Sequence, residues 1–495
     1  MVMIKKILHH CLCVILVCST IESFSQQNLL YEKIQQAKVN FTKINSVFKQ
    51  VVTEKQALNL FINPKDVSFM DYKKETFASL NEAIILSIPF KEDSIQIELL
   101  KVPASFYNYE VVTNNGQRFP ANKQIKHYRG VVKGNPNSLV AISFLEDEVI
   151  GLIVTEKGNF NLSLDKRLGK HIVYNDKNLK DKMSFKCGTR DNNLIKYNPE
   201  VLFQSSKLAT LSGDVCVRLY LETEYDIFQT RGSIASVESF ISAVFNQVAT
   251  LYQNENIEIS LSELYVWTTT DPYTSNDLST LLQQFQTYRT TFNGALGQLL
   301  TFRSGVGGGL AAGFDGLCNS NVSDRLSVAM LYDNYASVPT YSWTVQVITH
   351  EFGHLFGSRH THACVWNGNN TAIDGCAGGT EGGCSIPGIP SGGGTIMSYC
   401  HLQSVGINFN LGFGSQPGNV IRNSVANANC LCECAHSTIS GPSYICDEAT
   451  YSISNLPTGA TVTWTAEGDN WAVTINSPNS TQTTVTPEMI TASSG

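Results

Sequence analysis

The sequence predicts several domains: a β-rich N-terminal segment, a central α/β domain, and the opening strands of an all-β module. The chain has 495 residues, whereas single hydrophobic cores stop growing at about 250 to 300 residues. Lysine is frequent up to Lys207 and absent after it. Strand-like runs dominate the first part, strands alternate with helices in the middle, and short alternating runs return after residue 436.

The first 25 residues have the pattern of a secretory signal peptide. Two lysines precede an apolar run over residues 7 to 18, and small side chains at Ser23 and Ser25 fit a cleavage before Gln26. A membrane anchor is the weaker interpretation, because the run falls well below the roughly 20 residues that span a bilayer. No later stretch is apolar enough to cross a membrane, so we expect a secreted, extracellular chain.

Composition indicates an ordinary folded protein, with 42% apolar and 16% charged residues. The net charge of -7 hides an asymmetry. Residues 1–200 hold 27 Lys+Arg and 20 Asp+Glu, which gives +7, and residues 201–495 hold 8 and 22, which gives -14. An acidic second half argues against nucleic acid as a partner.

Cysteine usage fits an oxidising compartment. Of the 14 cysteines, three lie in the signal, Cys187 stands alone in the first half, and ten lie between Cys216 and Cys446. An even number in an exported chain predicts disulfides, whose connectivity the sequence does not reveal. Metal binding is the alternative for the cluster of Cys430, Cys432 and Cys434, and the compartment favours bridges.

In the N-terminal part, four apolar or β-branched runs predict strands: Ala83–Ile88, Ile95–Leu100, Leu139–Phe144 and Val149–Val154. Composition shifts near Val201, where we place a domain boundary.

The central part alternates strands and helices. Apolar residues from Val237 to Tyr252 recur at helical spacing and predict a long amphipathic helix, and a second helix should be capped by Ser275 or Asn276. The predicted strands are Cys216–Tyr220, Ile257–Leu261, Leu264–Trp267 and, after the glycine-rich residues 305–313, Leu326–Leu331.

After His436, three short alternating runs resemble the first strands of an immunoglobulin-like sandwich. They contain Tyr451 and Ile453, Val462 and Trp464, and Val473 and Ile475, with a turn at residues 455–459. Such a fold needs about 100 residues. We therefore expect this domain to be partial and the chain to be a fragment of a longer protein.

The stretch from Thr349 to His360 has the spacing of a metal site. His350 and His354 are one helical turn apart, so both imidazoles reach one ion at about 2.0 to 2.1 Å. A straight helix would carry His360 away, but Gly357 allows the positive φ that ends the helix and turns the chain back. Three nitrogens leave the fourth tetrahedral position open, which is typical of a catalytic zinc site.

Glu351, next to the first histidine, is the candidate general base. It lies too far round the helix to bind the ion, but it is placed to take a proton from a water that zinc activates. The alternative, surface histidines on a core helix, requires all of these residues to meet the spacing by chance. His362 has no such spacing, and we expect it to be a loop residue.

This pattern resembles the metzincin zinc endopeptidases. The segment Gly394–Cys400 is similar to their Met-turn, which implies that Met397 lies beneath the three histidines, with plain core filling as the alternative. The likeness is closest to the reprolysin or ADAM group and runs from about Gly213 to Cys434. At Thr361 the sequence departs from that group, which usually carries an Asp there that orients the local structure.

The resemblance implies an α/β (α+β) catalytic domain with a mixed sheet and an active-site helix. It also implies that Gly309, Leu310 and Ala311 form the edge strand that binds substrate. Cys187, in Phe185–Thr189, resembles the cysteine switch of metzincin propeptides. The resemblance implies that its thiolate binds zinc at the open position and excludes water. Pairing with a leftover cysteine is the alternative. A weaker likeness to the reprolysin propeptide lies at residues 127–130.

The sequence therefore predicts a secreted zinc endopeptidase made as a zymogen. Its parts are a signal peptide (1–25), a propeptide (26–207), a catalytic domain (208–436) and a partial immunoglobulin-like domain (437–495). We expect one catalytic Zn²⁺, peptide or protein substrates, and the propeptide as inhibitor, while calcium binding is not readable. The alternative is a secreted adhesive or binding module with a structural or vestigial zinc site. Glu351 argues against it, because a structural site needs no base.

Overall fold

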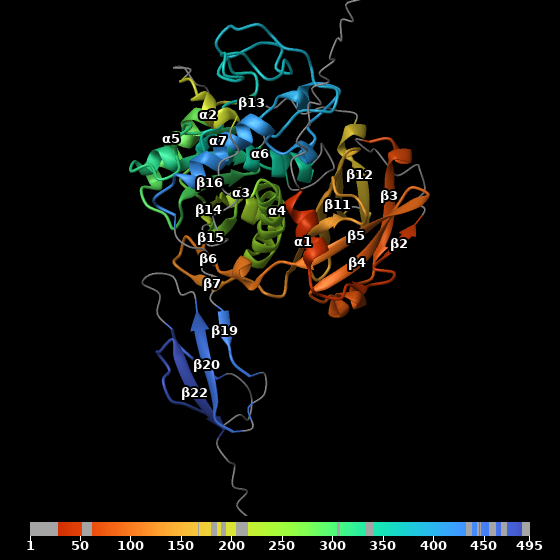
Figure 1. Cartoon of the computed structure of the whole chain (residues 1–495), viewed down its shortest axis with the longest axis vertical. Coiled ribbons are helices and arrows are strands. Elements are labelled where there is room, and N and C mark those ends of the chain that lie inside the picture. Colours follow the sequence, from red (N-terminus) through yellow and green to blue (C-terminus); the bar gives the residue numbers. More distant parts are fainter. Residues whose placement is uncertain are drawn as a thin grey trace, which may run out of the picture.

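A computed structural model shows how these segments are arranged (Figure 1). It describes residues 28–51, 62–166, 168–179, 186–189, 195–203, 216–303, 307–332, 340–431, 438–442, 445, 447–454, 462–466 and 473–487. The predicted signal peptide, the turn at 455–459 and Lys207 lie outside the described residues.

The N-terminal domain is a curled sheet of ten strands that begins after helix α1 (Leu29–Gln36). Neighbouring strands run antiparallel except for the pair of β1 with β4. In sheet order the strands are β1 (Thr42–Lys43), β4 (Ala83–Phe90), β5 (Asp93–Lys101), β8 (Lys126–Val132), β9 (Leu139–Phe144), β10 (Val149–Thr155), β11 (Gly158–Asp165), β12 (Lys170–Asn175), β3 (Val67–Tyr72) and β2 (Phe48–Val51). Strands β9 and β10 are buried at every residue, which explains why their sequences are nearly continuous apolar runs.

A second, mixed sheet forms the centre of the molecule. Its strands in order are β13 (Lys186–Cys187), β17 (Gly308–Ala311), β18 (Leu326–Met330), β16 (Leu296–Thr301), β14 (Val217–Thr223), β15 (Ile259–Val266), β6 (Glu110–Thr113) and β7 (Arg118–Pro120). Among the described strands of the central domain, β17 runs antiparallel to its neighbour β18, and β18, β16, β14 and β15 run parallel to one another. The N-terminal part of the chain thus supplies the outer strands at both edges of this sheet, β13 at one and β6 with β7 at the other.

The described residues of the central domain include the helices α3 (Tyr225–Arg231), α4 (Ile234–Asn254), α5 (Leu278–Tyr288), α6 (Thr340–Leu355) and α7 (Ser415–Ala426). A short helix, α2 (Pro199–Phe203), contacts α7. The long helix predicted around residues 237–252 is α4, whose cap is the Ser233 side chain. The cap of α5 is Asp277, which accepts from the Thr280 amide, so the predicted cap at Ser275 or Asn276 was wrong by one or two residues.

Helix α4 joins the two domains. It contacts β8 and β9 on one side and α6 and β15 on the other, and a single hydrophobic core includes Phe106 and Leu152 together with Phe240 and Phe245. Among the described residues, α4 is the helix long and apolar enough to cross a membrane, but it is mostly buried inside the protein. Its apolar character is therefore explained by this packing.

The sequence-based strands of the central domain are largely correct, with two differences. Ile257–Leu261 and Leu264–Trp267 belong to one strand, β15, whose pairing with β14 shifts by one residue near Ser262. The Ser262 hydroxyl donates to the Leu219 carbonyl at 2.8 Å, which fills the gap in the ladder. Strand β16 lies between predicted elements and was not expected.

The C-terminal segment forms a small antiparallel sheet in the order β19 (Thr438–Ser440), β20 (Ala449–Ser454), β22 (Gln482–Pro487) and β21 (Val473–Ile475). The predicted runs at residues 451–453 and 473–475 lie in β20 and β21. Residues 462–466 are not a strand, and the Trp464 amide donates instead to the Pro478 carbonyl at 2.8 Å.

Candidate metal centre

Helix α6 and the turn that ends it bring three histidines together. His350 and His354 lie one turn apart on α6, and their ring centroids are 4.7 Å apart. The helix ends at Leu355, and Gly357, at φ 111°, reverses the chain while the Ser358 amide donates to the Gly353 carbonyl at 3.0 Å. His360 thereby returns to the helix, with its Nε2 3.1 Å from the Nε2 of His354.

The other ring nitrogen of each histidine is held by an acceptor. His350 Nδ1 donates to the Ile396 carbonyl at 2.8 Å, and His354 Nδ1 donates to the Ser358 carbonyl at 2.7 Å. His360 Nδ1 donates to a carboxylate oxygen of Glu381 at 2.9 Å. Because these oxygens only accept, each neutral ring carries its proton on Nδ1, and its Nε2 is unprotonated and has a lone pair for a metal ion. Burial lowers the pKa of all three rings and keeps them in the neutral form that binds metals.

These nitrogens fit a zinc ion. Two nitrogens bonded to one tetrahedral zinc lie about 3.3 Å apart, close to the separation of the His354 and His360 nitrogens. Two bare nitrogens this near repel each other unless a cation lies between them. One ligand atom from each histidine and the Cys187 sulfur all lie within 4.8 Å of one another. The set is therefore three imidazoles and one thiol around a single position.

Cys187 reaches this position on β13. It pairs with Gly309 in a parallel register against β17, and its sulfur lies 3.3 Å from His354 Nε2. The thiol is the free cysteine of the described residues and is buried. The Tyr399 hydroxyl donates to the Cys187 carbonyl at 3.2 Å, which holds the segment from the other side.

Glu351 lies beside the histidine cluster and faces the same strand. Its Oε2 is 3.6 Å from the Cys187 sulfur and 3.4 Å from the Thr189 hydroxyl. Burial raises the pKa of Glu351 to about 8, and hydrogen bonds from Cys187 and Thr189 oppose that rise. A Cβ at Gly309 would lie 2.4 Å from Glu351 Oε1, so the strand leaves room for this carboxylate only because Gly309 has no side chain.

Met397 lies against α6, next to the metal-binding face. A Cβ at Gly353 would come within 2.8 Å of the Met397 sulfur, so the missing side chain lets the methionine approach the helix. The Met397 carbonyl accepts from the Thr361 amide at 3.2 Å, just after the third histidine. Gly309, Leu310 and Ala311, the proposed substrate strand, form β17 next to Glu351.

The match to a family model agrees with this geometry. Residues 215–406 match the family model of the reprolysin-like M12 metallopeptidases. These residues form a metzincin-type zinc metalloprotease domain. The chain is also 57% identical to karilysin of Tannerella forsythia over 42 residues, which is 8% of this chain and 9% of karilysin. The crystal structure of metalloproteinase-II from Bacteroides fragilis is similar over 60% of this chain and 90% of that chain, with 11% identity and a TM-score of 0.37.

Disulfides stabilise the part of the metalloprotease domain that follows the third histidine. Cys364 pairs with Cys384, and Cys376 pairs with Cys400. Cys318 pairs with Cys430, so this member of the 430–434 cluster is bridged; Cys432 and Cys434 lie outside the described residues. The two crossing bridges span the loop that leads from His360 to the Met397 turn.

Three residues near the metal centre were missed from sequence. Glu381 holds His360, and His362, expected only as a loop residue, is buried with its ring stacked 4.9 Å from that of His360. Tyr197 donates to the Gly357 carbonyl at 2.6 Å and accepts from the Arg359 amide at 3.0 Å. The available signal for Glu381 was that it and Asp374 are the only acids between Thr361 and Leu431.

Proposed function

We propose that this protein is a secreted zinc endopeptidase, made as a zymogen whose propeptide is the N-terminal domain and whose switch is Cys187. The observation that carries the proposal is the convergence of three bare imidazole nitrogens with the Cys187 sulfur, beside the carboxylate of Glu351. Disulfides in the metalloprotease domain support export to an oxidising compartment.

His350, His354 and His360 would hold the zinc ion. When bound, zinc supplies a Lewis acid that polarises a carbonyl group and lowers the pKa of a water toward about 7. Glu351 takes the proton from the attacking water and passes it to the amine that leaves. Without metal, burial raises the pKa of Glu351 to about 8. A zinc ion at the neighbouring histidines would lower this pKa and leave the carboxylate ionised, as a base that takes a proton must be.

Strand β17 would align the substrate. Its outer edge pairs with β13 in the closed form, and the Ala311 amide donates to the Thr189 hydroxyl at 2.8 Å. The same backbone groups become free for an extended peptide once residues 186–189 leave. Gly309 keeps that edge close to Glu351, which would bring the scissile bond near the base.

In the zymogen, the Cys187 thiolate would take the position that water needs. Burial, together with the charge of Glu351, raises the pKa of this thiol. A cation at the histidine cluster reverses this effect, because metal coordination deprotonates a thiol. Metal binding and inhibition would therefore support each other until the propeptide is cut.

The test is Glu351→Gln in the mature, zinc-loaded enzyme. All three ligands remain, so zinc content should stay at one ion per chain while turnover of a peptide library falls by about 10²- to 10⁴-fold. Asp277→Asn is the matched control: it changes an exposed carboxylate of the catalytic domain and keeps the oxygen that accepts from the Thr280 amide at the start of α5.

Turnover of the Glu351→Gln enzyme comparable to wild type would contradict the assigned base. A wild-type mature chain that holds zinc but cleaves no peptide would favour the adhesive alternative.

A further inference from the structure

We propose that Glu381 is a positioning residue for the metal site, which it serves by fixing the ring of the third histidine. The inference rests on the proposed zinc site but is independent of whether the site cleaves peptides. Thr361, the residue after His360, has no carboxylate. We assign to Glu381 the task of holding the His360 ring through a carboxylate oxygen.

The contact itself is direct. Glu381 Oε1 accepts from His360 Nδ1 at 2.9 Å and lies 3.4 Å from His362 Nε2. A carboxylate that accepts from Nδ1 fixes the tautomer and the orientation of the ring and raises the basicity of its Nε2. His350 and His354 receive the same support from backbone carbonyls. Among the three histidines, His360 therefore depends on a side chain for this hydrogen bond.

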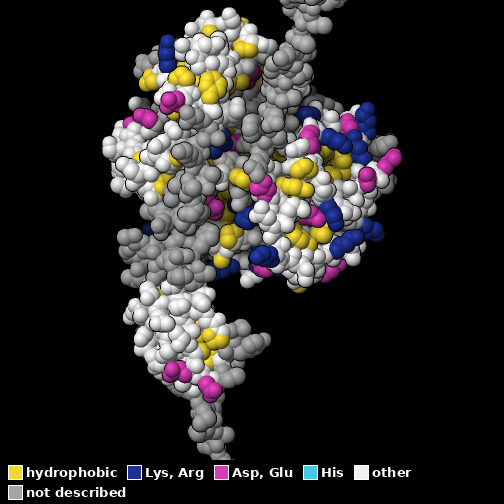
Figure 2. Space-filling model, in the orientation of Figure 1, with side chains coloured by type: hydrophobic (Ala, Val, Ile, Leu, Met, Phe, Trp, Pro, Cys, Tyr) yellow, Lys and Arg dark blue, Asp and Glu magenta, His cyan; other side chains and the backbone are white. Residues whose placement is uncertain are grey.

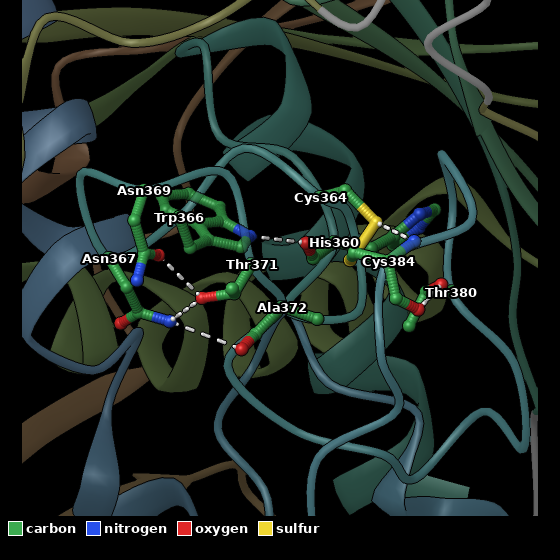
Figure 3. Close-up of a disulfide and its surroundings, with 9 residues drawn as sticks. All are labelled: His360, Cys364, Trp366, Asn367, Asn369, Thr371, Ala372, Thr380 and Cys384. Carbon is green, nitrogen blue, oxygen red and sulfur yellow. Dashed lines mark hydrogen bonds between the residues drawn. A yellow bond between two sulfur atoms is a disulfide. The ribbon is translucent and has the colours of Figure 1, made fainter.

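The backbone of Glu381 is held in register with the segment that follows His360. Its amide donates to the His362 carbonyl at 3.0 Å, and its carbonyl accepts from the Cys364 amide at 2.8 Å. The Cys364–Cys384 disulfide closes this loop, and Figure 3 shows the bridge beside His360. The Thr380 hydroxyl donates to the Cys384 carbonyl at 2.8 Å (Figure 3). This bond joins the two ends of the short segment that contains Glu381 and restricts its conformation.

The rest of the surroundings also restrict the His360 ring. His362 stacks on it with an angle of 11° between the planes, and Tyr399 contacts it edge-on with centroids 4.9 Å apart. The Trp366 indole donates to the His360 carbonyl at 2.8 Å (Figure 3). These contacts fix the position of the ring, and the Glu381 bond fixes its rotation and its proton.

The test compares Glu381→Ala with Glu381→Gln in the full-length chain carrying Cys187→Ser, so that three histidines alone hold the metal. Zinc dissociation constants are measured by competition with a chromogenic chelator. We expect Glu381→Ala to weaken zinc binding by about 10- to 100-fold, the usual effect of losing such a partner. Glu381→Gln keeps an oxygen acceptor and should restore most of that loss.

Asp374→Asn is the matched control. It removes the other carboxylate of this loop but keeps the oxygen that accepts from the Cys376 amide at 3.0 Å. We expect its zinc affinity to stay within about twofold of the parent, since that residue makes no such bond to a ligand. Thermal unfolding without metal should be similar for the parent and Glu381→Gln.

Equal zinc affinity of Glu381→Ala and its parent would overturn the positioning role. So would two zinc ions per parent chain with one in Glu381→Ala, because His360, His362 and Glu381 would then bind a metal themselves. A parent chain that binds no zinc refutes both this inference and the proposed function. A chain that binds zinc with the expected pattern of variants but cleaves no peptide refutes the proposed function alone.

Discussion

Two of the contacts between the N-terminal domain and the metalloprotease domain differ in their chemistry. At the metal centre the contact is small: two residues of β13 pair with β17, and Cys187 and Thr189 approach Glu351. At the opposite edge of the sheet, β6 pairs with four residues of β15, and α4 is buried against β8 and β9. If the N-terminal domain is the inhibitor proposed above, these two contacts have separate tasks: the first would block the reaction, and the second would supply most of the binding energy.

Polar groups make the second contact specific. The Asn246 amide on α4 donates to the Tyr128 carbonyl at 3.2 Å and accepts from Arg129 Nε at 2.9 Å. Tyr109 donates to Glu238 at 3.1 Å on the same helix. Lys and Arg are spread over the visible face of the N-terminal domain, whereas few lie on the visible face of the central domain (Figure 2). Exposed charges of this kind add little individually, so we attribute most of the affinity to the buried contacts.

The largest effect should come from the small contact. In Cys187→Ser a hydroxyl replaces the thiol, and a hydroxyl is a far poorer zinc ligand, so water regains the fourth position. We expect the uncut, zinc-loaded precursor to gain peptidase activity by about 10²-fold or more.

The measurement is peptide cleavage by precursor that gel electrophoresis shows to be intact. Thr189→Ser, which keeps the hydroxyl near Glu351, should leave the precursor silent. If the Cys187→Ser precursor is as inactive as wild type, the block is steric and the two tasks are not separate.

The next effect should come from the large contact. Asn246→Ala removes one hydrogen bond from the Tyr128 carbonyl and one from the Arg129 side chain. We expect this to weaken the binding of the N-terminal domain by about 1 to 3 kcal/mol. After the linker is cut, the N-terminal domain should dissociate about 5- to 150-fold more readily. Size-exclusion chromatography of the nicked protein at several dilutions measures this.

Gln247→Ala is the control, because that amide donates to the Ala243 carbonyl of its own helix. Turnover of the fully matured Asn246→Ala enzyme should equal wild type. If the cut N-terminal domain of Asn246→Ala stays bound as in wild type, the affinity between the two domains comes from other contacts, for example the pairing of β6 with β15.

The sequence predicted the metal centre better than it predicted the contact of the N-terminal domain with α4 and β15. The zinc motif, α4 and strands β9 and β10 are local patterns, so their spacing predicted them. The pairing of β6 with β15 joins residues more than 140 positions apart in the chain, and no local periodicity encodes it. Glu381 was missed because it lies in a glycine-rich loop, where its position depends on the disulfide rather than on helical or strand spacing.

A further effect should be a dependence of stability on pH. His127 is buried near α4, its Nδ1 lies 2.8 Å from the Ser143 hydroxyl, and burial lowers its pKa to about 3. Because this pKa lies below the ordinary value, the folded state favours the neutral ring. The stabilisation is complete above about pH 6.5 and is lost as the pH falls toward 3. At pH 5 the free energy of unfolding should be about 2 kcal/mol lower than at pH 7.5 because of this group.

Urea unfolding of metal-free precursor at the two pH values measures the effect. His127→Asn should be less sensitive to acid than wild type. His171 packs against Phe48 and Tyr72 inside the same domain, and burial lowers its pKa to about 4, so His171→Asn should also reduce the acid sensitivity. Equal acid sensitivity of wild type and His127→Asn would show that His127 does not cause the loss of stability in acid.

Release of the N-terminal domain would also change how the enzyme behaves in concentrated solution. With β6 gone, the peptide groups of Glu263 to Val266 on β15 lose their partners and form an open sheet edge. Open edges pair readily with other chains and promote aggregation, and charged side chains limit this. Glu263 is the one charged side chain in this four-residue stretch. We therefore expect the full-length chain to stay monomeric at higher concentration than a chain without the N-terminal domain, whose self-association should begin at the β15 edge.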